Sequence, residues 1–115
     1  MERCLICDSY GTQQCHVRAK SSFEDGEIHD FHNILYLCER HHYQYFDRGR
    51  LAIAADCSSV VLLHCVSYRR VETLKPQRRF YVKREYLDWK NDLCHSYLKA
   101  EIRRVSIEKV QPPIV

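Results

Sequence analysis

Short apolar runs separated by polar turns predict small strands in the first half of the chain. Residues 13–19 form the first strand candidate, and residues 34–37 form a brief apolar run further on. Residues 51–55 and 60–66 predict two more strands, because aliphatic and β-branched residues fill them and the turn 56–59 separates them. This pattern is typical of a small domain that contains a sheet.

Helical periodicity is strongest near the C-terminus. Apolar residues there recur at intervals that place them on one helix face, which we expect to pack against the core: Val82, Tyr86, Trp89, Leu93 and Tyr97. A shorter helix is predicted over residues 39–47, and Gly49 would end it. Residues 67–79 are basic and mostly polar, and they predict a connector that Pro76 interrupts.

The composition fits one compact domain. The chain has 115 residues, of which 45% are hydrophobic and 29% charged, a balance that argues against a wholly disordered chain. We expect a small α+β domain in which residues 1–66 form the principal unit and residues 67–115 add a basic connector and a C-terminal helix packed on it. The net charge of +3 is only a weak basic bias and does not by itself indicate a nucleic-acid partner.

The chain contains seven cysteines, a high and odd number. It begins Met1-Glu2-Arg3-Cys4, which lacks the features of a secretory signal peptide. Its longest strongly apolar run, residues 60–63, is far too short to span a bilayer. These features predict a cytoplasmic or nuclear protein with reduced thiols, in which clustered Cys and His residues indicate a metal site before they indicate disulfides.

Two half-sites with metal-ligand spacing predict a structural zinc ion. Two residues separate Cys4 from Cys7, and two separate Cys38 from His41. A tetrahedral zinc takes four N or S ligands, and this gap lets both ligands of a half-site reach one ion. Cys15 is a competing ligand that can replace Cys38 or His41. The alternative is scattered thiols that act as small core residues, which is our expectation for three others: Cys57, Cys65 and Cys94.

An ordered set of His and Asn residues lies between and after these half-sites. One segment reads Gln14-Cys15-His16-Val17-Arg18-Ala19-Lys20, and the next reads His32-Asn33-Ile34-Leu35-Tyr36-Leu37-Cys38-Glu39-Arg40-His41-His42. A third reads Phe46-Asp47-Arg48-Gly49-Arg50-Leu51. Through these segments, residues 4–66 resemble the HNH endonucleases. In that family a strand His, a loop Asn and a helix His surround one divalent ion, often beside a structural zinc.

The resemblance implies a role for each residue of this set. His16 is the general base that activates water, Asn33 orients that histidine and its strand, and His42 ligates the catalytic ion, Mg²⁺ or another divalent ion. An imidazole suits the base because its unperturbed pKa, about 6.5, is close to neutrality. Successive helix residues point about 100° apart, so His41 can face the zinc while His42 faces the second ion. Members of this family usually leave a 5′-phosphate and a 3′-hydroxyl.

Two positions depart from the family pattern. Members often place Asp or His before the base as a further metal ligand, whereas this chain has Cys15, and thiolates are poor ligands for Mg²⁺. Some members have His or Asp four residues after the third motif histidine, where this chain has Phe46. Asp47 is then the remaining candidate for a second ligand, with His29 and His32 as alternatives from the preceding loop.

Basic residues near the motif predict contacts with phosphates, which dominate nucleic-acid affinity. Some follow the base, some follow the third motif residue, and the rest form a basic stretch interleaved with aromatic residues: Arg18, Lys20, Arg48, Arg50, Arg69, Arg70, Arg78 and Arg79. The basic stretch is equally compatible with a solvated connector. Sequence preference stays open, because no side chain can be assigned to a base edge.

The function predicted from the sequence is metal-dependent cleavage or nicking of DNA, with double-stranded DNA as the partner. The main alternative is a zinc-stabilised nucleic-acid-binding module without catalysis, which Cys15 and Phe46 favour. A third hypothesis is an assembly subunit whose aromatic C-terminal helix binds another protein. The sequence leaves open the choice between DNA and RNA and the oligomeric state.

Overall fold

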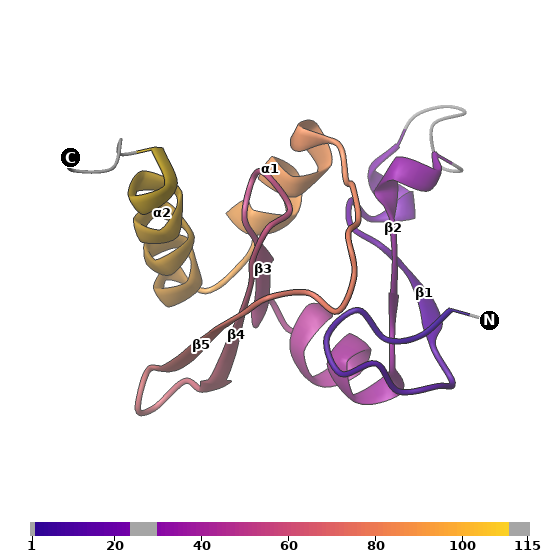
Figure 1. The fold of residues 1–115 in the computed structure, drawn as a ribbon, viewed down its shortest axis with the longest axis horizontal. Coiled ribbons are helices and arrows are strands. Elements are labelled where there is room, and N and C mark those ends of the chain that lie inside the picture. The colour runs from indigo at the N-terminus through magenta and orange to yellow at the C-terminus, as the bar shows by residue number, and fades with distance from the viewer. Residues whose placement is uncertain (1, 24–29, 111–115) are drawn as a thin grey trace.

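The computed structural model describes residues 2–23 and 30–110. It contains two small antiparallel sheets and several helices, so the predicted α+β class is confirmed (Figure 1). The molecule measures 46 × 29 × 27 Å, with the sheet of β1 (Gln13–His16) and β2 (Ile34–Leu37) toward one end of its long axis and α2 (Ser96–Val110) at the other. In the described part of the chain, no helix has the length and apolar character needed to cross a bilayer.

The strands β1 and β2 pair antiparallel along their whole length. Two short 3₁₀ helices, η1 (Lys20–Ser22) and η3 (Phe31–Asn33), lie between them in the sequence. The first strand was predicted over residues 13–19; it begins as expected but ends early. It ends because the Arg18 N–H donates to the side chain of Asn33 instead of to a strand partner.

The helix predicted over residues 39–47 is present, but most of it is a π-helix. After a short α-helical start comes η4 (His41–Phe46), whose wider turns are continued by a bond from the Asp47 N–H to the His42 carbonyl at 2.9 Å. Gly49 follows with a φ of 67°, which glycine adopts without steric conflict, and the helix ends before it as predicted. Turns of π-helix are rare and are often found at functional sites.

The central sheet has three antiparallel strands in the order β3 (Leu51–Ile53), β4 (Val60–Cys65) and β5 (Arg70–Leu74). The first two strands form the predicted hairpin. The connector predicted over residues 67–79 is wrong for part of its length, because β5 lies within it and pairs with β4. In β5 the apolar residues Val71 and Leu74 are separated by two polar ones, so neither an apolar run nor a regular alternation marks the strand, although Val71 packs against the core.

The long helix predicted near the C-terminus is broken into two helices. A short junction separates α1 (Arg84–Asp92) from α2, and there the His95 N–H donates to the Gly49 carbonyl at 3.1 Å. The break changes the buried face, since Leu93 is 61% exposed whereas Leu98 is fully buried. Of the predicted face, Val82 and Tyr86 are buried and Tyr97 packs against the core, so the prediction is wrong at Leu93, where the break between the two helices changes the face that points inward.

Both faces of β4 are buried, which explains its uninterrupted apolar sequence. Val60 and Leu62 belong to a core cluster that also contains residues of β1, β2, η4 and α1. Val61 and Leu63 belong to a second cluster shared with α2. The strand β4 thereby joins the part of the molecule that carries the HNH-like residues to the C-terminal helices.

Candidate functional site

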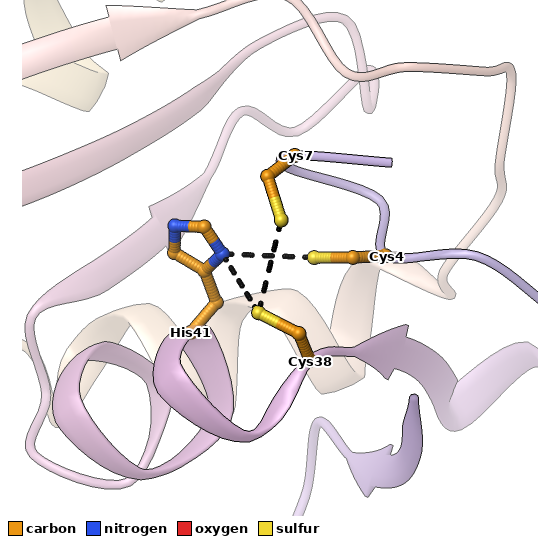
Figure 2. A group of neighbouring side chains, drawn as sticks. All are labelled: Cys4, Cys7, Cys38 and His41. Carbon is orange, nitrogen blue, oxygen red and sulfur yellow. Dashed lines mark hydrogen bonds between the residues drawn. The ribbon is translucent and has the colours of Figure 1, made fainter. Parts of the chain in front are cut away.

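The four predicted zinc ligands come together from two distant segments (Figure 2). Cys4 and Cys7 lie in the loop before β1, and Cys38 and His41 lie where β2 passes into η4. The His41 Nδ1 is 3.6 Å from the Cys4 Sγ and 3.2 Å from the Cys38 Sγ, and the Cys7 and Cys38 sulfurs are 3.8 Å apart. All four ligand atoms lie within 4.8 Å of one another, so they converge on one point.

This donor set fits a tetrahedral zinc ion. Zn–S and Zn–N bonds of about 2.3 Å and 2.0 Å place two sulfur ligands about 3.8 Å apart, and a sulfur and a nitrogen about 3.5 Å apart. The measured distances from the His41 Nδ1, 3.6 and 3.2 Å, and the Cys7–Cys38 distance of 3.8 Å are close to these values. Three thiols and an imidazole can therefore hold a metal such as zinc here.

The loop before β1 favours the thiolate forms of Cys4 and Cys7. Burial by itself raises the pKa of the Cys4 thiol, but N–H groups of Cys38, Cys7 and Ile6 point at its sulfur and bring the pKa below its usual value. The pKa of Cys7 is also lowered, because hydrogen bonds from Ser9 outweigh the effect of burial. Burial and the nearby Cys4 charge raise the pKa of Cys38. The N-terminal half-site thus stabilises the thiolate form that binds zinc.

Cys15, the competing ligand, lies outside this cluster. Its thiol is buried, and its Sγ is 3.6 Å from the Gln13 carbonyl oxygen. Burial, and after it the charge of Asp47, raises the pKa of Cys15 to about 12, so this thiol stays neutral. Of the three cysteines expected in the core, two are buried and the third is half-buried at the end of β4: Cys57, Cys94 and Cys65 respectively.

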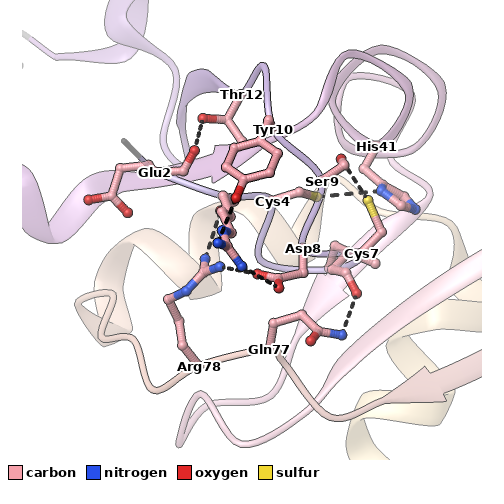
Figure 3. Close-up of polar contacts among 12 residues, drawn as sticks. Glu2, Cys4, Cys7, Asp8, Ser9, Tyr10, Thr12, His41, Gln77 and Arg78 are labelled. Carbon is pink, nitrogen blue, oxygen red and sulfur yellow. Dashed lines mark hydrogen bonds and ion pairs between the residues drawn. The ribbon is translucent and has the colours of Figure 1, made fainter.

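A segment far along the chain braces the loop that carries Cys4 and Cys7 (Figure 3). Gln77 donates its backbone N–H to the Leu5 carbonyl at 2.9 Å. Arg78 donates to the Arg3 carbonyl at 2.7 Å and to the Asp8 carboxylate at 2.8 Å. Arg78, which was expected to contact phosphates, is therefore engaged within the protein. Nothing in the sequence indicates this brace, because Arg78 and Asp8 are 70 positions apart.

Asn33 fixes the backbone that follows His16. Its side chain is fully buried, with its Oδ1 accepting from the Arg18 N–H at 2.8 Å and its Nδ2 donating to the Arg18 carbonyl at 2.9 Å. The Asn33 carbonyl also accepts from the Val17 N–H at 2.8 Å. His16 itself is half-buried at the end of β1, opposite Ile34 in the β1–β2 pairing. A residue that orients the His16 strand requires contacts of this kind.

His42 faces Gln13 and Asp47, whereas its neighbour His41 faces the cysteines. The His42 Nδ1 is 2.7 Å from the Gln13 Oε1, and its Nε2 is 3.3 Å from the Asp47 Oδ1. An amide oxygen accepts hydrogen bonds, so the Gln13 Oε1 can accept from a protonated His42 Nδ1, and the His42 Nε2 lies toward the Asp47 carboxylate. The ring also stacks on Tyr43, with 4.6 Å between the centroids. The structure thus brings together His42 and Asp47, the two residues expected at the catalytic ion.

A buried lysine lies near the same carboxylate. Lys90 of α1 donates to the Phe46 carbonyl at 2.5 Å, and its Nζ is 3.9 Å from the centroid of the Phe46 ring. Burial lowers the pKa of the Lys90 ammonium, and the Asp47 charge offsets part of that effect. The C-terminal part of the chain therefore delivers a cation to the end of η4, next to Asp47.

Sequence reasoning missed both Gln13 and Lys90. The sequence could have indicated Gln13, since it lies two residues before Cys15, the position of a family metal ligand, and residues two apart in a strand point to the same face. Lys90 had none, because only the packing of α1 against η4 brings it to the site. Of the two alternative ligands in the preceding loop, His29 lies outside the described residues, and the His32 Nδ1 is 3.5 Å from an Asp30 carboxylate oxygen.

The eight basic residues expected to bind phosphates fall into two groups. Three of them donate to other groups of the protein and a fourth stacks on the Tyr97 ring: Arg18, Arg50, Arg78 and Arg69. The other four are exposed and form no ion pair with any residue that the structure describes: Lys20, Arg48, Arg70 and Arg79. The second group is available for contacts with a nucleic acid.

Comparison with known proteins identifies the segment that carries these residues. No curated protein and no solved structure matches the chain. A family model described as HNH endonuclease matches residues 4–54, which run from the first cysteine of the metal cluster to just beyond β3. The matched segment holds the whole Cys₃His cluster together with His16, Asn33, His42 and Asp47. Residues 4–54 of this chain are therefore similar to the HNH endonuclease family, which confirms the resemblance seen in the sequence.

Proposed function

We propose that the chain is a metal-dependent endonuclease that hydrolyses phosphodiester bonds of DNA, with duplex DNA as its partner. The proposal rests on one arrangement, the His42–Asp47 pair held beside Gln13 within a segment that matches HNH endonucleases. The family implies a nucleic-acid substrate. The exposed basic residues on the same chain supply the charge that phosphates require.

The His42–Asp47 pair fits two neighbouring ligands of a divalent ion. Adjacent ligands of an octahedral ion with bonds of about 2.1 Å lie about 3.0 Å apart. The His42 Nε2 and the Asp47 Oδ1 are 3.3 Å apart. The Gln13 Oε1 lies 2.7 Å from the His42 Nδ1, a place from which outer partners of metal-bound histidines commonly accept the ring proton. A bound Mg²⁺ or similar ion would stabilise the charge that develops on the leaving oxygen.

His16 is the proposed general base. It takes a proton from the attacking water, a task for which an imidazole is suited near neutral pH. Asn33 is a positioning residue, since its three hydrogen bonds hold the two residues after His16. The backbone at the end of β1 can then keep the ring in place while its charge changes.

Zn²⁺ is the proposed occupant of the cluster formed by Cys4, Cys7, Cys38 and His41, and its role is structural. Four protein ligands fill a tetrahedral ion and leave no position for a substrate. Because His41 and His42 are adjacent, an ion on His41 also fixes the helical turn that carries His42. The zinc would thereby support the second metal site without taking part in the chemistry.

One observation favours a second candidate function, a zinc-stabilised nucleic-acid-binding module without catalysis. The position before the base holds Cys15, whose pKa of about 12 keeps it a neutral thiol and a poor ligand for a hard ion. Lys90 places a further positive charge near Asp47. A divalent ion at this site would therefore have His42 and Asp47 as its two proposed protein ligands.

A plasmid-nicking assay decides between these two functions. The wild-type protein should convert supercoiled plasmid to the nicked form with Mg²⁺ or Mn²⁺, and His16→Ala should lower the rate about 10²- to 10⁴-fold. His95→Ala is the matched control, because His95 is exposed at the α1–α2 junction and lies outside the family match. If the wild type binds DNA but nicks nothing with any divalent ion, the endonuclease proposal fails and the binding module replaces it.

A further inference from the structure

An exposed aromatic cluster stands directly before Asn33 in the sequence. Phe31 is 72% exposed and Tyr81 is 63% exposed, and both lie against the ring of His32. The centroid of His32 is 4.0 Å from that of Phe31 and 5.2 Å from that of Tyr81. Single exposed aromatic residues are common, but contiguous ones brought together from two distant segments indicate a binding surface.

Ion-pair and hydrogen-bond contacts hold this cluster in a fixed arrangement. The Asp30 carboxylate accepts from the His32 N–H at 2.9 Å, from the Lys83 Nζ at 2.7 Å and from the Tyr86 hydroxyl at 3.0 Å. The Lys83 N–H also donates to the His32 carbonyl at 3.2 Å. These contacts hold the segment before α1 against η3. They therefore position the rings of Phe31 and His32 on one side and of Tyr81 on the other before any ligand binds.

A pocket of about 310 Å³ opens beside the cluster. It lies between β2 and residues 78–81, the segment that leads into α1 in Figure 1, and its volume is at the low end for small-ligand pockets, about 300–1,000 Å³. Its walls include all three rings of the aromatic cluster. Arg79 also lines the pocket and is exposed, and it pairs with no acidic residue in the described part of the chain. Glu2 is the acidic residue among its lining residues.

We propose that this pocket binds one unpaired nucleotide of the nucleic-acid substrate. The base stacks against Phe31 and Tyr81, and Arg79 pairs with the adjoining phosphate. Stacking on aromatic side chains combined with basic groups along the backbone is how proteins hold single-stranded nucleic acid with little sequence preference. This inference rests on the proposed function and narrows its substrate to DNA with an unpaired nucleotide near the cleaved bond.

The position of the pocket relative to His16 supports this substrate. Ile34 lines the pocket and is the cross-strand partner of His16 in the β1–β2 pairing. Directly opposed residues of antiparallel strands have Cβ atoms about 5 Å apart. A nucleotide in the pocket therefore places a neighbouring phosphodiester bond beside the strand pair that carries the proposed base.

Binding measurements without added divalent ions test the pocket separately from catalysis. The probe is a fluorescein-labelled 12-mer of deoxythymidylate, compared by anisotropy with a blunt duplex of the same length. Phe31→Ala and Tyr81→Ala should each weaken binding of the single strand about 5- to 150-fold, since base–aromatic stacking contributes about 1–3 kcal/mol. Affinity for the blunt duplex should stay within twofold of wild type. Arg79→Ala should weaken single-strand binding and reduce its dependence on salt.

Two matched variants control for lost aromatic surface and lost charge. Tyr68 is 86% exposed at the β4–β5 turn, and Arg103 is exposed on α2, so Tyr68→Ala and Arg103→Ala should leave single-strand affinity unchanged. The inference is overturned if the Phe31 and Tyr81 variants bind the single strand as the wild type does, or if the wild type does not bind it. If the wild type nicks DNA but the pocket variants bind the single strand normally, the pocket inference alone is wrong. If single-strand binding depends on the pocket but the wild type nicks nothing, the endonuclease proposal alone is wrong.

Discussion

Asn33 and Arg18 form a closed two-point contact in which the side-chain amide of Asn33 both accepts from and donates to the backbone of Arg18, at 2.8 and 2.9 Å. The contact reproduces the two hydrogen bonds of a strand ladder at the point where β1 has ended. It therefore extends the order of the β1–β2 sheet past His16 by means of one buried side chain.

Replacing Asn33 with alanine should destabilise the protein. The change leaves the Arg18 N–H and carbonyl without their partner in a part-buried place, and each unpaired group costs about 1–3 kcal/mol. We expect the free energy of unfolding, measured in urea, to fall by about 2–6 kcal/mol. Gln14→Ala, which removes one exposed side-chain hydrogen bond to Tyr36, is the control and should cause little change. Equal effects of the two substitutions would contradict this account of Asn33.

Removal of one cysteine from the metal cluster should release the metal. Cys4→Ser weakens a tetrahedral set, so the purified protein should lose most of its zinc, measured by inductively coupled plasma mass spectrometry, and its Tm should fall. Cys65→Ser is the matched control, because Cys65 is a half-buried thiol outside the cluster. A wild-type protein that is folded, reduced and free of zinc would show that the proposed occupant is wrong.

Alanine should be tolerated less well at Gly49 than at Gly11. Both glycines have positive φ, 67° and 77°, so an alanine at either position carries the left-handed strain of about 1–2 kcal/mol. A Cβ at Gly49 would also lie 3.0 Å from the Leu93 carbonyl oxygen, whereas a Cβ at Gly11 meets no atom within 4 Å. Gly49→Ala should therefore lower the urea midpoint clearly more than Gly11→Ala does. Equal midpoints would mean that the Gly49–Leu93 approach is not a tight contact in solution.

The contacts of the Asp30 carboxylate should stabilise the folded protein at neutral pH, and acid should remove this stabilisation. The Lys83 ammonium and further hydrogen bonds lower the pKa of Asp30 from 3.8 to about 2. A carboxyl with a lowered pKa stabilises the folded state above its unfolded pKa, and this stabilisation disappears as the pH falls from about 4 to about 2. Asp30→Asn should therefore be less stable than wild type at pH 7, with the difference shrinking below about pH 4.

The control for this pH dependence is Asp88→Asn. Asp88 pairs with Arg84 on the surface of α1, where both side chains are mostly exposed, and such pairs contribute little. Its unfolding midpoint should follow that of the wild type at every pH. A difference between Asp30→Asn and wild type that stayed constant down to pH 2 would rule out the charge of Asp30 as its cause.

Substitution of His16 and of His42 should impair nicking in different ways if one residue is the base and the other a metal ligand. His42→Ala removes one of two proposed ligands, so nicking should require more Mn²⁺ and recover in part when Mn²⁺ is raised. His16→Ala removes the proton acceptor, and added metal should not restore its rate. Titrations of Mn²⁺ in the plasmid-nicking assay measure both effects. Recovery of His16→Ala by metal would reverse the two assignments.

The sequence by itself determined the Cys₃His cluster and the similarity to HNH endonucleases, because both depend on local spacing. The two-residue gaps in Cys4–Cys7 and Cys38–His41 place each pair of ligands on one loop or turn, whatever the rest of the fold does. The β3–β4 hairpin was readable for the same reason, since two apolar runs flank one tight turn. The HNH-like order of His and Asn residues needed only the linear chain.

Only the tertiary structure decided which residues surround these local units. The apolar periodicity of the C-terminal segment continues through residues 93–95, but packing of the junction against Gly49 breaks the helix there, because carbonyl and N–H groups of the two segments meet at close range. The contacts of Gln13 with His42, and of Asp30 with Lys83, likewise join segments far apart in the chain. Hydrogen bonds and ion pairs between such segments have no periodicity in the sequence, so they emerge only when the packed core brings their partners together.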